Sequence, residues 1–554
     1  MKKISISENI LWKSTFILAL LVYAAGLLVE VMEPDAALYA EVSREMFESG
    51  RYLDIILRGV DWLDKPHLQF WVTAWSYGIF GVNQIAFKIP AVLCILGAVY
   101  YTYLFACRYY SAKHGAIAAL ILMTVQHIIT SNMDVRAEPY LTLFTIMALY
   151  HVAVYLDTRK LLQLILCSAA LAALMMTKGL FTIIPVAAGV GCTLLYQQKW
   201  KSIIHWQWLL CGALSILFMA PALYGYYQQF DMHPEKWVFD RQGVSGIRFF
   251  LIDSQWGRFV NSGPIKGSGD PFFFVHTLLW AFLPWAWIAY YALFQKTKRL
   301  IQRTDQHESY TYFGFLIMFG IFSASKFQLA HYLNPVFPLL AIITAAAILT
   351  ATQKALRILT ILQFITIGLL LIAAGALLYF FQDHFLHADT ILIMVFGIGL
   401  GIVSLYAKNK GSLVRLIFVP LLVTLSINYY LNREFYPALT GYQSESAVAD
   451  FYIEQKFPAD RIVSLDVTEF STSFKLKTVI PFYTVEKVQA QQLQQKYVYT
   501  SARGLAKIDS LQLPRTVIKT FGDFHVTMLT GEFINKATRA STLSPMYLLK
   551  VGEQ

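Results

Sequence analysis

Apolar runs that are long enough to cross a bilayer recur along this chain as far as residue 431, and they limit its fold more than any other feature. A helix of roughly 20 residues spans a hydrocarbon core of roughly 30 Å. Backbone polar groups in lipid must bond within their own segment, so these runs are expected to be helices. Thirteen spans are predicted, over roughly 12–31, 84–107, 115–132, 139–156, 161–177, 179–196, 207–227, 272–294, 311–325, 333–351, 355–381, 389–407 and 412–431. The chain is therefore predicted to be a polytopic α-helical membrane protein.

The composition agrees with this class of protein. Hydrophobic residues make up 57% of the 554 residues and charged residues only 14%, whereas soluble domains carry roughly a quarter charged residues. The formal charge of +11 does not indicate nucleic-acid binding, because the excess lies in short loops between predicted spans and not on one folded face. All five cysteines fall in or at the ends of predicted spans, so neither a disulfide framework nor a zinc knuckle is expected.

Lysine and arginine are distributed unequally between alternate loops. If the N-terminus is cytoplasmic, the inside connections hold eighteen of them and the short outside connections hold three, Arg136, Lys178 and Lys326. Basic residues accumulate on the cytoplasmic side of membrane proteins. The bias predicts a cytoplasmic N-terminus, and an odd number of spans then places the C-terminal region outside. The first span has no small-residue cleavage pattern after it, so it is expected to be retained.

Two long outside regions interrupt the spans, over residues 32–83 and 228–271. The first is predicted to hold a helix from Ala36 to about Ser49, capped by Asp35 and stopped by Gly50. This helix is expected to lie along the membrane surface as part of a platform with the aromatic-rich segment that follows.

The tail after the last span differs in composition from the rest of the chain. Its charge is nearly balanced, and short apolar runs alternate with amphipathic stretches. Residues 432–554 are therefore predicted to form a small extracytoplasmic α/β domain, attached to a transmembrane domain over residues 1–431.

Charged side chains gather at span ends on the predicted outer side. They lie in EPDAALYAE, MDVRAEPYLTLF, MTKGL and SKFQLAHYLNPVFP. Carboxylates can act on a hydroxyl or sugar and cations can hold a phosphate, so the pattern favours chemistry on a phosphorylated lipid. Structural roles stay open for the same residues, as helix caps, as partners of a helix dipole, or as side chains that reach lipid headgroups.

Six stretches, in this order, resemble a known family. They are PDAALYAEVSREM, LDKPHLQFW, FGVNQIAFKIPAV, MTKGL, PFFFVHTLLWAFLPW and FSASKFQLAHYLNPVFP, and they cover about residues 30–340. The chain is similar to the ArnT-like bacterial glycosyltransferases, which are related to protein O-mannosyltransferases and have the GT-C fold. The resemblance implies inverting transfer of a sugar from a polyprenyl-phosphate donor, such as undecaprenyl phosphate, to lipid A, another glycan or a protein. It also implies a place in the bacterial inner membrane.

The resemblance also assigns candidate residues. The family's first-loop acid matches Asp35 and its second acid matches Glu138, and both are predicted to be catalytic. Asp35 would act as a general base or orient the acceptor, and cations would neutralise the leaving phosphate. Ala36 and Leu38 replace a usual Glu and Arg, so aminoarabinose specificity is not implied. The predicted substrate and donor-phosphate contacts are Glu41, Asp64, Lys65, Lys178, Arg258, Lys326 and His331.

Two alternatives from other classes stay open. The chain could be a transporter or lipid flippase with an acidic outer vestibule, or a membrane scaffold whose tail recruits partners. No cofactor is expected to be required and no metal ligand is assigned. A divalent cation such as Mg or Mn could bind only if several of the hard oxygen ligands converge, and these are Asp35, Glu41, Asp64 and Glu138.

Overall fold

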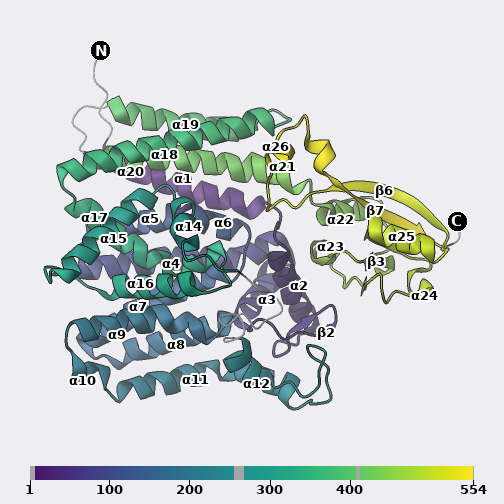
Figure 1. The fold of residues 1–554 in the computed structure, drawn as a ribbon, viewed down its shortest axis with the longest axis horizontal. Coiled ribbons are helices and arrows are strands. Elements are labelled where there is room, and N and C mark those ends of the chain that lie inside the picture. Colours follow the sequence, from purple (N-terminus) through teal and green to yellow (C-terminus); the bar gives the residue numbers. More distant parts are fainter. Residues whose placement is uncertain (1–6, 255–267, 407–411, 553–554) are drawn as a thin grey trace.

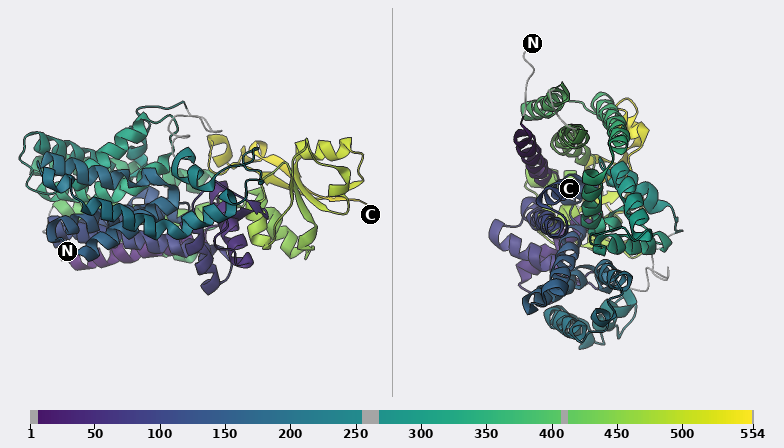
Figure 2. Two further views of the ribbon diagram at one scale, coloured as in Figure 1. Left: turned by 90° about the horizontal axis from the view of Figure 1, so that it is seen from below. Right: turned by 90° about the vertical axis from the view of Figure 1, so that its left-hand side faces the viewer.

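The computed structural model describes residues 7–254, 268–406 and 412–552. A bundle of helices forms most of the molecule, and a smaller region with a β-sheet lies beyond one end of it (Figure 1). The start of α1 and the C-terminal sheet lie at opposite ends of the bundle (Figure 2). The bundle helices are α1 (Glu8–Leu28), α4 (Gln84–Tyr109), α5 (Ala112–Thr124), α6 (Gln126–Met133), α7 (Glu138–Thr158), α8 (Leu161–Lys178), α9 (Ile184–Tyr196), α10 (Trp200–Ile203), α11 (Gln207–Tyr226), α14 (Phe273–Ala281), α15 (Ala286–Ile301), α16 (Tyr310–Ala324), α17 (Phe337–Thr350), α18 (Gln353–Phe380), α19 (Ala388–Tyr406) and α20 (Ser412–Tyr430).

Short segments join or extend these helices. They are η1 (Leu180–Ile183), η2 (Tyr227–Asp231), α12 (Gly246–Arg248), η3 (Phe249–Asp253), η4 (Ala330–Val336) and η5 (Leu431–Phe435).

The predicted spans all fall on helices, although not all are single long ones. Within the described residues, nine helices are long and apolar enough to cross a membrane, and the bent pair α5 and α6 adds a tenth. The segments Leu180–Tyr196 and Tyr310–Ala324 are shorter apolar helices. The polytopic helical prediction is confirmed, whereas the number of thirteen crossings stays a prediction.

Two predicted spans contain breaks. The span over 272–294 is divided between α14 and α15, where Pro284 lacks the backbone N–H that a helix needs. The pair α5 and α6 bends by 52° at Val125, which is extended. The backbone N–H of Gln126 then donates to the carbonyl of Leu283 at 2.9 Å. The two breaks therefore lie side by side, and the backbone N–H freed at the bend of α5 and α6 bonds to a carbonyl at the break between α14 and α15.

Helix α2 (Pro34–Ser49) begins two residues earlier than predicted. Its N-cap is Glu33, and Asp35 lies inside the first turn, so the prediction that Asp35 caps the helix is wrong. Proline suits the first helical position because its φ is fixed and its missing N–H has no helical partner there. Gly50 ends the helix at φ 68°, as predicted.

Helix α2 is largely covered by other parts of the chain, and the prediction that it lies along the membrane surface stays a prediction. It runs across the direction of the bundle helices (Figure 1) and packs against α3 (Leu68–Phe80) and α23 (Phe470–Leu476). Arg44 and Glu41 are each 2% exposed and form an ion pair of 2.6 Å. A short hairpin of β1 (Ile56–Leu57) and β2 (Val60–Asp61) follows α2.

The C-terminal region contains a five-stranded mixed sheet in the order β4, β3, β5, β7, β6. Strand β3 pairs in parallel with β4 and β5, and β7 pairs antiparallel with β5 and β6. This is the α/β architecture that the tail's composition predicted. Its elements are α21 (Tyr436–Thr440), α22 (Ser444–Glu454), η6 (Ala459–Arg461), β3 (Ile462–Leu465), α23, β4 (Phe482–Tyr483), α24 (Ala490–Leu493), β5 (Tyr497–Ser501), α25 (Ala502–Ser510), β6 (Arg515–Asp523), α26 (Gly531–Ile534), η7 (Arg539–Thr542) and β7 (Ser544–Val551).

The predicted domain boundary at residue 432 falls inside a continuous helix. This helix runs from α20 through η5 and α21 to Thr440. Asn432 is 2% exposed and its amide donates to the carbonyl of Val22 on α1 at 2.9 Å. The polar residues after 431 therefore bond within the bundle and do not mark its end.

The C-terminal region is fixed to the first loop by a buried ion pair. Arg58, in the turn of the β1–β2 hairpin, pairs with Glu469, whose side chain is 1% exposed. The Arg58 guanidinium also lies 4.7 Å from the ring of Phe470 and 4.3 Å from that of Phe482. The backbone N–H of Arg58 donates to Glu45 on α2 at 2.7 Å. The sheet region and the helix that carries Asp35 thus form one packed unit.

Candidate functional site

Two adjoining cavities lie where the bundle meets the first loop. The larger has a volume of about 510 Å³ and is lined by Asp64, Lys65 and many apolar side chains from η1, α9, α11, η3 and α16. The smaller is about 20 Å³ and lies against Glu138. Both are lined by Lys178, Phe181, Met318, Phe322 and Tyr332.

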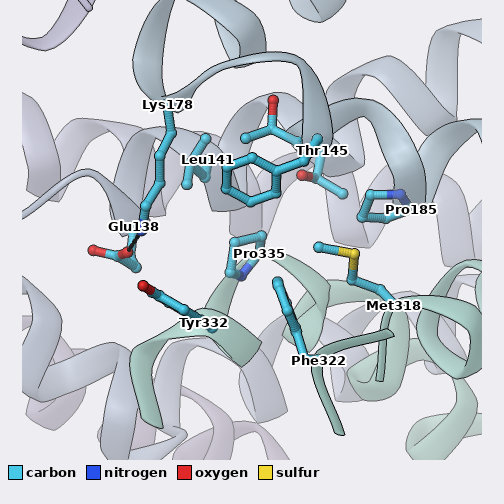
Figure 3. Close-up of a pocket in the computed structure, with 11 residues that line it drawn as sticks. Glu138, Leu141, Thr145, Lys178, Pro185, Met318, Phe322, Tyr332 and Pro335 are labelled. Carbon is cyan, nitrogen blue, oxygen red and sulfur yellow. Dashed lines mark hydrogen bonds and ion pairs between the residues drawn. The ribbon is translucent and has the colours of Figure 1, made fainter. Parts of the chain in front are cut away.

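Glu138 and Lys178 are the charged residues in the lining of the smaller cavity and lie at one side of it (Figure 3). The Lys178 ammonium donates to the Glu138 carboxylate at 2.6 Å, and the two side chains are only 10% and 2% exposed. The ammonium also lies 4.6 Å from the centre of the Tyr332 ring, which favours a cation electrostatically. Glu138 begins α7 and Lys178 ends α8, so the turns of two packed helices set their separation.

A second cation, Arg136, connects this pair to the first loop. It forms an ion pair of 2.6 Å with Glu33 and donates to Nδ1 of His331 at 3.1 Å. With Nδ1 accepting that bond, the ring proton of neutral His331 lies on Nε2, which is 3.7 Å from a Glu138 oxygen. Acid and base groups from three parts of the sequence thus alternate in one network.

The hydroxyl of Tyr39 is buried within the electrostatic influence of three predicted acids. Burial raises its pKa well above the ordinary value, and the charges of Asp35, Asp64 and Glu138 raise it further. Arg136 acts in the opposite direction. The side chain of Asp35 is exposed and makes no ion pair or hydrogen bond with a described residue. Its carboxylate is therefore accessible to a bound molecule at the edge of this charged network.

Asp64 and Lys65 form an ion pair on the wall of the larger cavity. The hydroxyl of Tyr226 donates to the carbonyl of Lys65 at 3.3 Å, which holds this loop against α11. The matched acid and lysine of the first loop therefore face the same cavity as Lys178.

Among the described residues, the predicted contacts Glu41, Lys326 and His331 and the predicted catalytic residue Asp35 line neither cavity. Glu41 pairs with Arg44 in the interior of α2's packing and lines neither cavity, because its desolvated charge needs that guanidinium. Lys326 is exposed between Ser325 and Phe327, which do line the larger cavity. Arg258 lies outside the described residues.

The site also contains residues that the sequence alone did not single out. The sequence identifies Arg136 only as an outer cation and assigns no role to Glu33, Tyr39 or Tyr332. The feature of the sequence that could have identified these residues is their position within or beside the motifs that contain the acids and lysines. The described residues contain no group of three or more His, Cys, Asp or Glu side chains placed to hold a metal ion. The expectation that no cofactor is required stays a prediction.

The chain is similar to several known proteins. The family model described as dolichyl-phosphate-mannose-protein mannosyltransferase matches residues 64–224. An uncharacterised protein of Aquifex aeolicus is 26% identical over 372 residues, covering 66% of this chain and 69% of that protein. An undecaprenyl phosphate-alpha-4-amino-4-deoxy-L-arabinose arabinosyl transferase of Shewanella sediminis is 25% identical over 419 residues, 71% of each chain.

The crystal structure of ArnT from Cupriavidus metallidurans bound to undecaprenyl phosphate superposes with a TM-score of 0.74 at 18% identity, over 98% of both chains. This likeness extends over the bundle and the C-terminal sheet alike and establishes the fold. The chain has the fold of ArnT and is similar in sequence to the arabinosyl transferases of this kind. The segment that matches the family model, residues 64–224, contains Asp64, Lys65, Glu138 and Lys178 of the candidate site.

His67 of this ArnT-like chain is buried beside the Asp64–Lys65 loop and supplies a pH-dependent contribution to stability. Its Nε2 lies 2.9 Å from the carbonyl of Leu53, and Nδ1 has no hydrogen-bond partner in the described residues. The ring packs between Trp71 and Tyr226, at centroid distances of 5.2 and 4.9 Å. Burial lowers the pKa of His67 to about 4.

Neutral His67 makes its full contribution to the free energy of unfolding above its unfolded-state pKa of about 6.5. This contribution is lost as the pH falls towards the pKa of His67 in the folded protein. Between pH 7 and pH 5 the wild type should lose about 2 kcal/mol from this group. The His67→Asn variant should be less stable than the wild type at pH 7, but its stability should fall by about 2 kcal/mol less between pH 7 and pH 5. The control variant His233→Asn, at an exposed position, should lose as much stability over this pH range as the wild type. Thermal unfolding in detergent at the two pH values measures the difference, and equal pH dependence in wild type and His67→Asn would contradict the prediction.

Proposed function

We propose that this ArnT-like chain moves a sugar from a polyprenyl-phosphate donor, such as undecaprenyl phosphate, to an acceptor in the bacterial envelope. The observation that carries the proposal is one cavity lined by Lys65, Lys178 and the apolar side chains of bundle helices. Cations suit a phosphate and the apolar lining suits the first part of a polyprenyl chain. The relatives named for arabinosyl transfer from undecaprenyl phosphate support the same donor class.

The reaction that fits this site is an inverting displacement. An acceptor oxygen forms a bond to the anomeric carbon, and the bond from that carbon to the phosphate oxygen breaks with its electron pair on the phosphate. When the acceptor is a hydroxyl, its proton passes to Asp35. Lys65 and Lys178 stabilise the charge that develops on the leaving phosphate. The Arg136–Glu33 pair holds the loop before Asp35 close to Glu138.

The acceptor we propose is lipid A or another glycan or protein of the envelope, and the sugar is a pentose or hexose. We favour lipid A because a relative that is 25% identical and aligns over 71% of this chain is named for 4-amino-4-deoxy-L-arabinose transfer. Ala36 and Leu38 stand beside Asp35 in this chain, where small and apolar side chains leave the sugar fewer polar contacts. The topology we propose places the N-terminus in the cytoplasm, and the site and the C-terminal sheet outside the inner membrane.

Loss of the gene should remove one sugar from an envelope lipid, glycan or protein. Mass spectrometry of envelope lipids and glycoproteins from a deletion strain would identify the sugar and the acceptor together. The wild-type chain should restore the sugar, and the Asp35→Asn chain should not. If the strain instead loses coupled uptake or lipid translocation while every envelope sugar is retained, the transporter alternative is correct and the proposal fails.

A further inference from the structure

A third cavity, of about 280 Å³, lies between the bundle and the C-terminal region. Its wall is formed by the end of α1, the turn between α3 and α4, and helices α22 and α23. None of its lining residues lines the two cavities at Lys178. It is therefore separate from the proposed transfer site.

The wall of this junction cavity presents hydrogen-bond donors and a cation. Lys477 is exposed at φ 53°, just after α23, and forms no ion pair with any residue that the structure describes. The hydroxyl of Ser471 likewise has no partner within the described parts of the chain. Lys475 donates to Glu30 and Asp450, both at 2.8 Å. The ammonium of Lys477 and the hydroxyl of Ser471 are thus available to an added acceptor.

The negative charge of Glu30 in the same wall is already compensated. One of its oxygens accepts from Lys475 at 2.8 Å and the other from the hydroxyl of Ser446 at 2.5 Å. Lys475 is shared between Glu30 and Asp450, so the cation of the lining that has no ion-pair partner among the described residues is Lys477. The ammonium of Lys477 therefore favours an anion beside it.

The cavity lies where two candidate membrane spans end. Helix α1 ends at Leu28 and α4 begins at Gln84, and the Gln84 amide donates to the carbonyl of Leu28 at 2.9 Å. Exposed apolar side chains flank this contact: Leu28 is 57% exposed, Ile79 74% and Ile85 38%. Such side chains at a span end face acyl chains, so the cavity lies at the depth of lipid headgroups.

We propose that the junction cavity binds the phosphate-bearing headgroup of a membrane lipid. Phosphate oxygens accept hydrogen bonds, which the Lys477 ammonium and the Ser471 hydroxyl can donate. The acyl chains would lie along Leu28, Ile79 and Ile85. A phosphorylated glycolipid and an ordinary anionic phospholipid share this chemistry, and the bound lipid could come from either source.

The test measures lipid binding to the full-length protein in detergent by native mass spectrometry. Phosphatidylglycerol, lipid A and inorganic phosphate are titrated separately against the wild type, Lys477→Gln and the control Lys487→Gln. Lys487 is also an exposed lysine of the C-terminal region but does not line the cavity. We expect Lys477→Gln to bind at least one of the lipids about fivefold more weakly, the effect of one lysine near a membrane surface. Lys487→Gln should bind like the wild type.

The three probes separate the two sources. Preferential loss of lipid A binding would assign the cavity to a phosphorylated glycolipid, and preferential loss of phosphatidylglycerol would assign it to bulk phospholipid; both support the proposal. It is overturned if Lys477→Gln and Lys487→Gln bind each lipid equally, or if only inorganic phosphate responds. Because only binding is measured, failure of the proposed sugar transfer would leave this result unchanged.

Discussion

Sugar transfer by an Asp35→Asn variant should be lower than that of the wild type by a factor of roughly 10² to 10⁴, the contribution of a general base. Asparagine keeps the size of the side chain but cannot take a proton from an acceptor hydroxyl. Because the side chain of Asp35 makes no ion pair or hydrogen bond with a described residue, the loss should appear in kcat while folding and donor binding remain normal. Transfer from a polyprenyl-phosphate sugar by the purified, reconstituted chain provides the measurement.

The matched control for this prediction is Asp54→Asn. Asp54 lies in the same loop and forms an ion pair of 2.6 Å with Arg51, but it lines neither cavity at Lys178. The control should keep nearly full activity. An Asp35→Asn protein that inserts normally and still transfers at the wild-type rate would refute the assignment of Asp35. A phosphate acceptor, which is already ionised, needs no base and would produce that result.

Replacing Lys178 with methionine should affect both transfer and stability. The ammonium is positioned to stabilise the leaving phosphate, and loss of one such group lowers kcat by roughly 10² to 10³. Methionine also leaves the Glu138 carboxylate, 2% exposed, without its ion-pair partner. A buried charge that loses its partner costs roughly 3 to 5 kcal/mol of stability.

A double variant separates the two effects of Lys178. In Lys178→Met with Glu138→Gln, both charges of the pair are removed, so most of the lost stability should return. Transfer should stay low because the phosphate still lacks its cation. Thermal unfolding and initial rates on the wild type, both single variants and the double variant provide the comparison. Recovery of transfer together with stability would mean that Lys178 has only a structural role.

The fold could be predicted from the sequence because the membrane imposes a local rule. Each apolar run must bond its own backbone, so the thirteen predicted segments could be assigned to helix without knowledge of their neighbours. The positions at which the helices break could not be predicted from this local rule. The extended residue Val125 is tolerated only because Leu283, far away in the chain, accepts the freed N–H of Gln126.

Part of the candidate site could also be predicted from the sequence, because its residues belong to motifs that occur in a fixed order. Motif order located Asp64, Lys65, Glu138 and Lys178, and the structure brings them to adjoining cavities. Glu41 belongs to the same motif as Asp35, yet it turns to Arg44, because a buried carboxylate takes the nearest guanidinium. Fewer than two turns of helix separate the exposed carboxylate of Asp35 from the buried ion pair of Glu41, and the pattern of residues does not distinguish the two environments.

The sequence by itself determined that this protein is a bundle of membrane helices with acids and lysines at one end, since hydrophobicity and helix formation act over short stretches of chain. Only the tertiary structure decided which charges meet. Arg136 joins Glu33 to His331, and Glu469 holds Arg58, and each of these pairs is separated by more than one hundred residues of chain. Such pairs form because desolvated charges require partners at contact distance, and packing of remote segments alone supplies those distances.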